Sequence, residues 1–154
     1  MWSLWAQASL DYRQILAIRM DRIANDFLPF DLTVKCSGNT VVLPLYTGEL
    51  MEVSLSRGVQ WDRTFATQAN SSLMHLFSLD AIGGLLSTFQ QRNDDRALRF
   101  AVVAIRSFLD HSSKIGHQSS IGKIPSADHS AATRVRVLIK FIQVMRERQD
   151  ADHA

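Results

Sequence analysis

The spacing of apolar residues changes along this chain from a helical period to a strand period and back, and that change restricts its fold. Over Ser3–Phe27, apolar side chains recur at steps of three and four residues, as on one face of an amphipathic helix. Between Asp31 and Leu55, apolar and polar residues alternate, which is typical of half-buried strands. From Asp62 onward the helical period returns. We therefore predict a helix-dominated α+β fold with a small sheet between an N-terminal helix and a helical C-terminal half.

The alternating region predicts a three-stranded antiparallel meander. Short turns containing Gly38 and Gly48 separate the runs, as in hairpins. Pro44 has no backbone N–H to donate, so we expect a bulge or a free edge at that residue. The predicted strands cover residues 31–36, 40–46 and 50–55.

The helical half begins with Asp62, which we predict to be a helix N-cap because its carboxylate can accept a hydrogen bond from a free backbone amide. A second piece, from Ile82 to Phe89, contains the pair Gly83-Gly84. Each glycine costs about 1 kcal/mol in a helix relative to alanine, so the pair predicts a kink or a close helix contact. Asn93-Asp94-Asp95 predicts a break followed by a new cap.

The segment Arg96–Asp110 is apolar around most of its circumference. Its charged residues Arg96, Arg99, Arg106 and Asp110 are spaced to share one stripe of a helix. A helix of this composition is either central to the core or covered on a second side by a partner.

Residues 111–130 have no periodicity and are rich in serine, glycine and histidine, which predicts a flexible loop. A final helix is predicted over Ala131–Gln149, and we find no linker that separates two cores, so residues 1–154 form one predicted domain. The apolar face predicted for the last helix consists of Val135, Leu138, Ile139, Ile142 and Met145. The opposite, polar stripe consists of Arg136, Lys140, Gln143 and Glu147.

Composition excludes several classes of protein. With 46% hydrophobic residues and a net charge of +2 in 154 residues, the chain is not intrinsically disordered. We see no run of about 20 apolar residues, so no transmembrane segment is predicted. The single cysteine, Cys36, forms no internal disulfide and suggests a reducing, cytoplasmic location. The charge excess is local, since residues 112–154 carry seven basic and four acidic side chains.

Motifs for catalysis are missing. The chain has no glycine-rich phosphate loop, no G-x-S-x-G elbow and no closely spaced Cys/His ligand set, so we predict no catalytic residue, cofactor or metal site. Asp94-Asp95 fits a helix cap, Cys36 a small core residue and His75 a partly buried structural histidine. A small-molecule enzyme or binding domain, with a site assembled from distant residues, remains one alternative.

Surface residues suited to partners remain. Trp2 and Trp5 either anchor an interface or clamp the first helix to the core. The arginines Arg96, Arg99 and Arg106 either meet phosphates or acidic side chains, or form a solvated face. The basic side of the last helix, with Arg134, Arg136 and Lys140, suits an acidic protein, RNA or a membrane surface. We predict a non-enzymatic protein-interaction or assembly subunit, such as an adaptor, chaperone-like or structural component that associates with a partner or with itself.

Leu79–Asp110 resembles part of the coat proteins of rod-shaped plant viruses of the tobamovirus type. The matching residues are Leu79-Asp80, Leu85-Leu86, Phe89, Arg92-Asn93, Asp94-Asp95 and Val103-Ala104-Ile105-Arg106-Ser107. The resemblance implies two neighbouring helices of a four-helix bundle, with Arg92, Arg96 and Arg99 as candidates for RNA contact. The chain departs from the family because the Arg-Asn and Asp-Asp elements abut and the strand region has no counterpart. An RNA-binding, self-assembling coat-type nucleoprotein is therefore kept as the second alternative.

Overall fold

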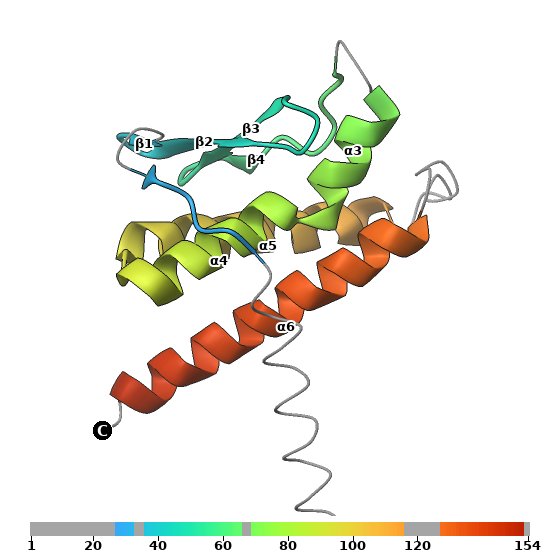
Figure 1. Cartoon of the computed structure of the whole chain (residues 1–154). Coiled ribbons are helices and arrows are strands. Elements are labelled where there is room, and N and C mark those ends of the chain that lie inside the picture. Colours follow the sequence, from blue (N-terminus) through green and yellow to red (C-terminus); the bar gives the residue numbers. More distant parts are fainter. Residues whose placement is uncertain (1–26, 33–35, 66–68, 116–126, 153–154) are drawn as a thin grey trace, which may run out of the picture.

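The structure, a computed structural model, describes residues 27–32, 36–65, 69–115 and 127–152 (Figure 1). The predicted N-terminal helix, with Trp2 and Trp5, lies outside these residues apart from its last position. The described elements form an α+β fold dominated by helices, as predicted. They are β1 (Cys36–Ser37), β2 (Thr40–Pro44), β3 (Leu50–Ser54), β4 (Gly58–Val59), α3 (Ala69–Ser78), α4 (Asp80–Arg92), α5 (Asp95–Ile115) and α6 (Ala127–Asp152).

The sheet is an antiparallel meander in the order β1-β2-β3-β4, and β2 and β3 confirm the second and third predicted strands. Of the first predicted strand, 31–36, only Cys36 lies in a described strand, because Asp31 and Leu32 are outside the sheet and 33–35 lie outside the described residues. The two-residue strand β4 was not predicted. The pair β2–β3 runs from Thr40↔Ser54 to Pro44↔Leu50. Pro44 ends β2, and the described pairing of β1 with β2 stops short of it. Alternate residues of β2 and β3 point into the core, as the period of two predicted: Val41, Leu43, Met51 and Val53 are buried.

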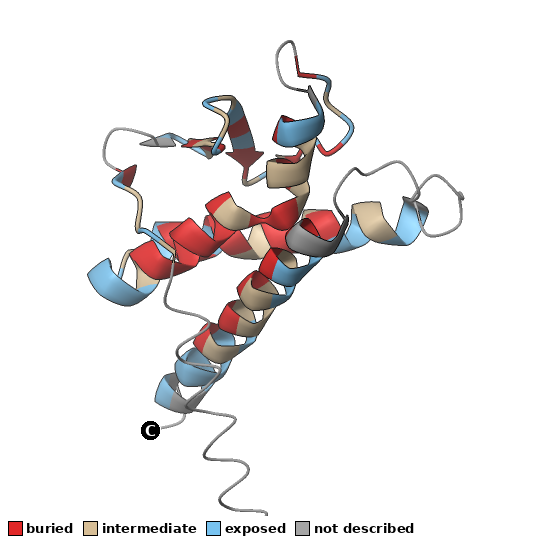
Figure 2. Ribbon diagram, turned by 45° about the vertical axis from the view of Figure 1, so that its right-hand side comes forward, coloured by how far each residue is buried: buried red, intermediate tan, exposed pale blue. Residues whose placement is uncertain are grey.

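The elements stack in layers (Figure 1). The sheet lies over α4 and α5, and α6 crosses on the far side of α4. Helix α4 is covered from both directions, and its eight residues from Ala81 to Thr88 are all buried (Figure 2). Helix α5 buries Phe100, Ala104 and Phe108 but leaves Leu109 half exposed. Thus α4, rather than the segment 96–110, is the central helix.

Helices α3 and α4 meet at Leu79, a buried residue with a φ of 65°. A left-handed backbone is unfavourable for a residue with a Cβ, and here it interrupts the helix. By length and composition alone, the stretch Asn70–Arg92 could cross a membrane, although no transmembrane segment was predicted. Two thirds of its most apolar window (67%) is buried within the fold, as in the core helix of a soluble protein.

The Gly83-Gly84 pair makes a close contact, one of its two predicted roles. An ideal Cβ on Gly83 would lie 2.6 Å from the ring of Phe27, and one on Gly84 would overlap the ring of Phe30. The backbone N–H of Phe30 also donates to Thr88 Oγ1 at 2.7 Å. The two glycines therefore let the segment before the sheet lie directly on α4.

Two predicted boundaries are wrong. Asp62 is not an N-cap, because residues 62–65 are not helical and the described part of α3 begins at Ala69. Hydrogen bonds from the segment 59–63 to Ser107 of α5 and to the carbonyl of Leu50 hold it along the sheet instead. The predicted loop 111–130 is shorter than expected, because α5 continues to Ile115 and α6 begins at Ala127. Residues 116–126 lie outside the described part.

Candidate interaction surface on helix α6

Helix α6 turns toward the core a face different from the one its apolar pattern predicts. Val137, Lys140 and Val144 are buried, and α6 packs on α3 and α4. By contrast, Val135 is 55% exposed and Ile142 is 50% exposed. Of the five residues expected to be buried, Val135, Ile142 and Met145 are exposed, whereas Leu138 and Ile139 are half-buried and Leu138 packs against the core. Figure 2 shows exposed and buried residues along α6.

The inward position of Lys140 follows from a polar partner on α4. Its Nζ donates a 2.9 Å hydrogen bond to Ser87 Oγ, and both side chains are almost completely buried. The ring of Phe27 lies 5.9 Å from the same nitrogen. Burial lowers the pKa of Lys140, and the nearby carboxylate of Glu147 partly offsets this by raising it. The methylene stem of Lys140 packs in the core while Ser87 accepts one hydrogen bond from its amine.

The exposed apolar residues of α6 follow a heptad spacing. We define the α6 stripe as Val135, Leu138, Ile142 and Met145; Leu138 is half-buried and the other three are exposed. Their steps of three, four and three residues are those of the a and d positions of a coiled coil. Because α6 already buries a separate face on α3 and α4, the stripe is a second apolar surface on one helix.

A groove between α5 and α6 adjoins the stripe. The two helices run antiparallel, since Arg148 pairs with Asp95 at 2.7 Å near one end and Arg134 lies over the Phe108 ring farther along. The groove has a volume of about 760 Å³, and its apolar wall includes Leu98, Val102 and Met145. Met145 belongs to both groove and stripe, so the two form one continuous surface.

Most of the basic residues singled out in the sequence are held by other parts of the fold. Arg92 lies 3.7 Å from Asp31, and Arg96 makes a two-pronged contact with Asp94 that also lowers the pKa of that carboxyl. On α6, Arg134 donates to the carbonyl of Phe77 and to Ser130, and Arg136 lies over the Phe27 ring. Together with Lys140, these residues do not form a single free basic face.

Arg99, Arg106 and Arg146 differ from that group. All three are exposed, and none forms an ion pair within the described part of the chain. Arg99 lines the α5–α6 groove, and Arg146 directly follows Met145 of the stripe. Cations therefore border the apolar surface on two sides. Sequence reasoning identified Arg99 but did not single out Arg146, because the predicted orientation of α6 was wrong.

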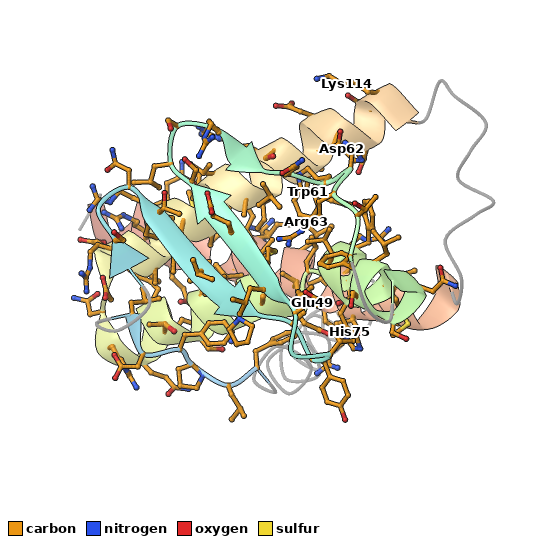
Figure 3. All side chains as sticks on the ribbon, turned by 90° about the horizontal axis from the view of Figure 1, so that it is seen from above. Glu49, Trp61, Asp62, Arg63, His75 and Lys114 are labelled. Atoms are coloured by element: carbon orange, nitrogen blue, oxygen red, sulfur yellow. The ribbon has the colours of Figure 1, made fainter. Side chains whose placement is uncertain are left out.

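Other titratable groups are scattered rather than gathered at one place (Figure 3). Asp62 and Lys114 lie near Trp61 at one end of the molecule, whereas Glu49 and His75 lie at the other. Nδ1 of His75 is 3.3 Å from Asp80, so this pair spans the α3–α4 break at Leu79. A polar groove of about 870 Å³ beside β3 and β4 contains Arg57 and Glu52, which face each other at 3.6 Å.

The pair Ser87–Lys140 has the residue types of a nucleophile and its base, but a substrate has no access to it. Ser87 is 1% exposed and Lys140 is 2% exposed. Nucleophilic catalysis requires the hydroxyl to meet a reacting carbon in a cleft. In residues 27–32, 36–65, 69–115 and 127–152, no three His, Cys, Asp or Glu side chains are grouped to hold a metal ion.

Ser107 has a structural role that sequence reasoning missed. Its hydroxyl accepts hydrogen bonds from the backbone N–H of Val59 and from Trp61 Nε1 at 3.2 and 2.9 Å. A Cβ on Gly58, whose φ is +73°, would lie 2.6 Å from that hydroxyl. A serine inside a helical pattern gives no sign of such partners, because they lie 46 and 48 residues away in sequence.

Compared with known proteins, the chain matches no family model, no curated protein and no solved structure.

Proposed function

We propose that this protein is a non-enzymatic interaction subunit that binds a protein partner on the α6 stripe and the adjoining α5–α6 groove. One observation carries the proposal: α6 buries a lysine, while three of the four apolar residues of its heptad-spaced row are exposed and the fourth, Leu138, is half-buried. A helix that faces only one core normally turns its apolar residues inward. A row of large apolar side chains on the opposite side is typical of a helix that is covered twice.

The chemistry of this surface favours binding over catalysis. Contiguous exposed apolar surface marks sites of protein interaction, whereas single exposed residues need no explanation. Here Ile142 and Met145 are neighbours at helical spacing, the half-buried Leu138 lies between Ile142 and Val135, and Met145 lines the groove. Helices bind such surfaces by inserting side chains at matching i, i+3, i+4 and i+7 positions.

Site-specific photo-crosslinking in the native cell tests the proposal. A photoreactive amino acid is placed at Ile142 in one variant and at Leu50 of β3 in another; these residues are 50% and 51% exposed. We expect protein adducts from position 142 and none from position 50. Mass spectrometry of the adducts would separate a second copy of this chain from a different protein.

Equal adducts from both positions, or none from either, would contradict the proposal. Light scattering on the purified chain adds a second measurement. A strict monomer that also yields no adduct at Ile142 would leave the α6 stripe without any protein partner, and the proposed function would be rejected.

A further inference from the structure

We infer that the partner bound by the α6 stripe is an amphipathic helix whose apolar face is flanked by acidic side chains. This inference rests on the proposed function and names the partner's chemistry. A heptad-spaced row on a straight helix beside an open groove fits a second helix, because a and d side chains insert into spaces between four residues of the facing helix.

The positive charges around the stripe indicate that the side chains of the partner are negatively charged. Arg146 follows Met145, and Arg99 lines the groove on the α5 side. Arg148 also lines the groove, and its Nη1 donates a 2.7 Å hydrogen bond to Asp95 Oδ1. The border therefore offers guanidinium groups, which bind carboxylates in a fixed two-pronged geometry. Of the nearby acids whose side chains the structure describes, Asp95 is already paired, and Glu147 raises the pKa of the buried amine of Lys140.

A second copy of this chain fits the same surface less well. Two α6 stripes facing each other would place Arg146 and its neighbour Arg148 of each chain among the arginines of the other. Like charges across an interface oppose association, and among the described side chains in this half of α6 only Glu147 is acidic. The charge pattern favours a partner that brings its own carboxylates.

RNA also fits less well. The centre of this surface is apolar, and most of its basic candidates already have protein partners: Arg134 and Lys140 are hydrogen-bonded, and Arg136 lies over the Phe27 ring. Binding to RNA depends mainly on cations that neutralise phosphates. An acidic amphipathic helix would use both the apolar row and Arg99 and Arg146, which form no ion pair with another described residue.

Fluorescence anisotropy with two designed peptides tests the inference. Each has 21 residues, with Ile at a and Leu at d; one carries Glu at e and g, and the other carries Lys. We expect the folded full-length protein to bind the acidic peptide at least about tenfold more tightly at 50 mM salt. This advantage should shrink at about 0.5 M salt, where charges are screened beyond about 4 Å.

Matched variants assign the effect to the site. Arg146→Glu should remove the preference for the acidic peptide. Arg57→Glu, which makes the same charge change in the exposed β3–β4 turn, should not. Ile142→Ser should weaken binding of both peptides by at least about tenfold, and circular dichroism should show an unchanged fold because Ile142 is half exposed.

Each other outcome overturns the inference in a distinguishable way. Equal or tighter binding of the basic peptide, lost in Ile142→Ser, would overturn the acidic assignment but leave the proposed function standing. No binding of either peptide, combined with Ile142 crosslinks to a second copy, would assign the stripe to self-assembly. Tighter binding of a 20-nucleotide polyuridine that depends on Arg146 but not on Ile142 would favour RNA and contradict both proposals.

Discussion

At the scale of single residues, Lys140 accounts for the largest difference between the sequence pattern and the structure. Sequence reasoning placed it on the solvated stripe of the last helix because lysine is rarely buried without a partner. The partner is Ser87, 53 residues earlier on α4, and no local pattern connects the two. Val137 and Val144 form a second apolar row on α6. This row contains Lys140 and is shorter than the row that starts at Val135, which was predicted to be buried.

The buried amine predicts a pH dependence of stability. Because burial lowers the pKa of Lys140 in the fold, the unfolded chain binds more protons between that pKa and the ordinary value of about 10.4. The free energy of unfolding contributed by this group therefore rises as pH increases through this alkaline window. In Lys140→Met, denaturant unfolding at several pH values should show a smaller alkaline rise and about 1 kcal/mol more stability at pH 7.

Lys114→Met is the matched control, since Lys114 is exposed on α5, and it should leave the alkaline rise unchanged. A loss of stability in Lys140→Met, together with an unaltered pH profile, would show that the amine is not held in the core.

The contact of Gly84 with Phe30 predicts that Gly84→Ala destabilises the natural chain but stabilises a chain in which Phe30 is alanine. Gly84→Ala should destabilise the fold by about 1–3 kcal/mol, because its Cβ would overlap the ring of Phe30. In a Phe30→Ala background, the same change should stabilise by about 1 kcal/mol through higher helix propensity. Denaturant unfolding of the four proteins in this cycle measures both values; an additive cycle would contradict the contact.

At the scale of elements, strands β2 and β3 and helices α4 and α5 follow from periodicity, whereas their ends depend on tertiary contacts. The last turn of α5 was predicted to be loop, yet His111 packs against the rings of Trp61 and Phe77. Burial among these groups lowers the pKa of His111. Partners this distant in sequence extend a helix beyond the point where its apolar pattern fades.

The hydrogen bonds of Ser107 join α5 to β4 and to the segment that follows it, and their loss should lower the stability of the fold. Ser107→Ala would leave the N–H groups of Val59 and Trp61 without their acceptor, at a cost of about 1–3 kcal/mol. Ser113→Ala, which loses one exposed bond to the carbonyl of Asp110, should change stability by less than about 0.5 kcal/mol. Thermal or denaturant unfolding checks both; equal effects would mean that the Ser107 contacts do not stabilise the fold.

At the scale of the whole molecule, the α+β class and the order of strands before helices in the described residues could be predicted, but the layering could not. The sequence contains two apolar rows on its last helix, and packing against α3 and α4 buries one of them. The other row remains at the surface and forms the candidate site. Arg99 was found from its spacing, whereas Arg146 and the α6 stripe became visible only once α6 was oriented on the core.

The most direct test of the account compares two valines that are two residues apart on α6. Val135 is 55% exposed, and Val137 is fully buried. In a Cys36→Ser background, Val135→Cys and Val137→Cys are labelled with a thiol reagent under native conditions. We predict that Cys at position 135 reacts nearly as fast as in the unfolded chain, while Cys at position 137 is strongly protected. The reverse order would place the α6 stripe in the core and contradict the proposed interaction surface.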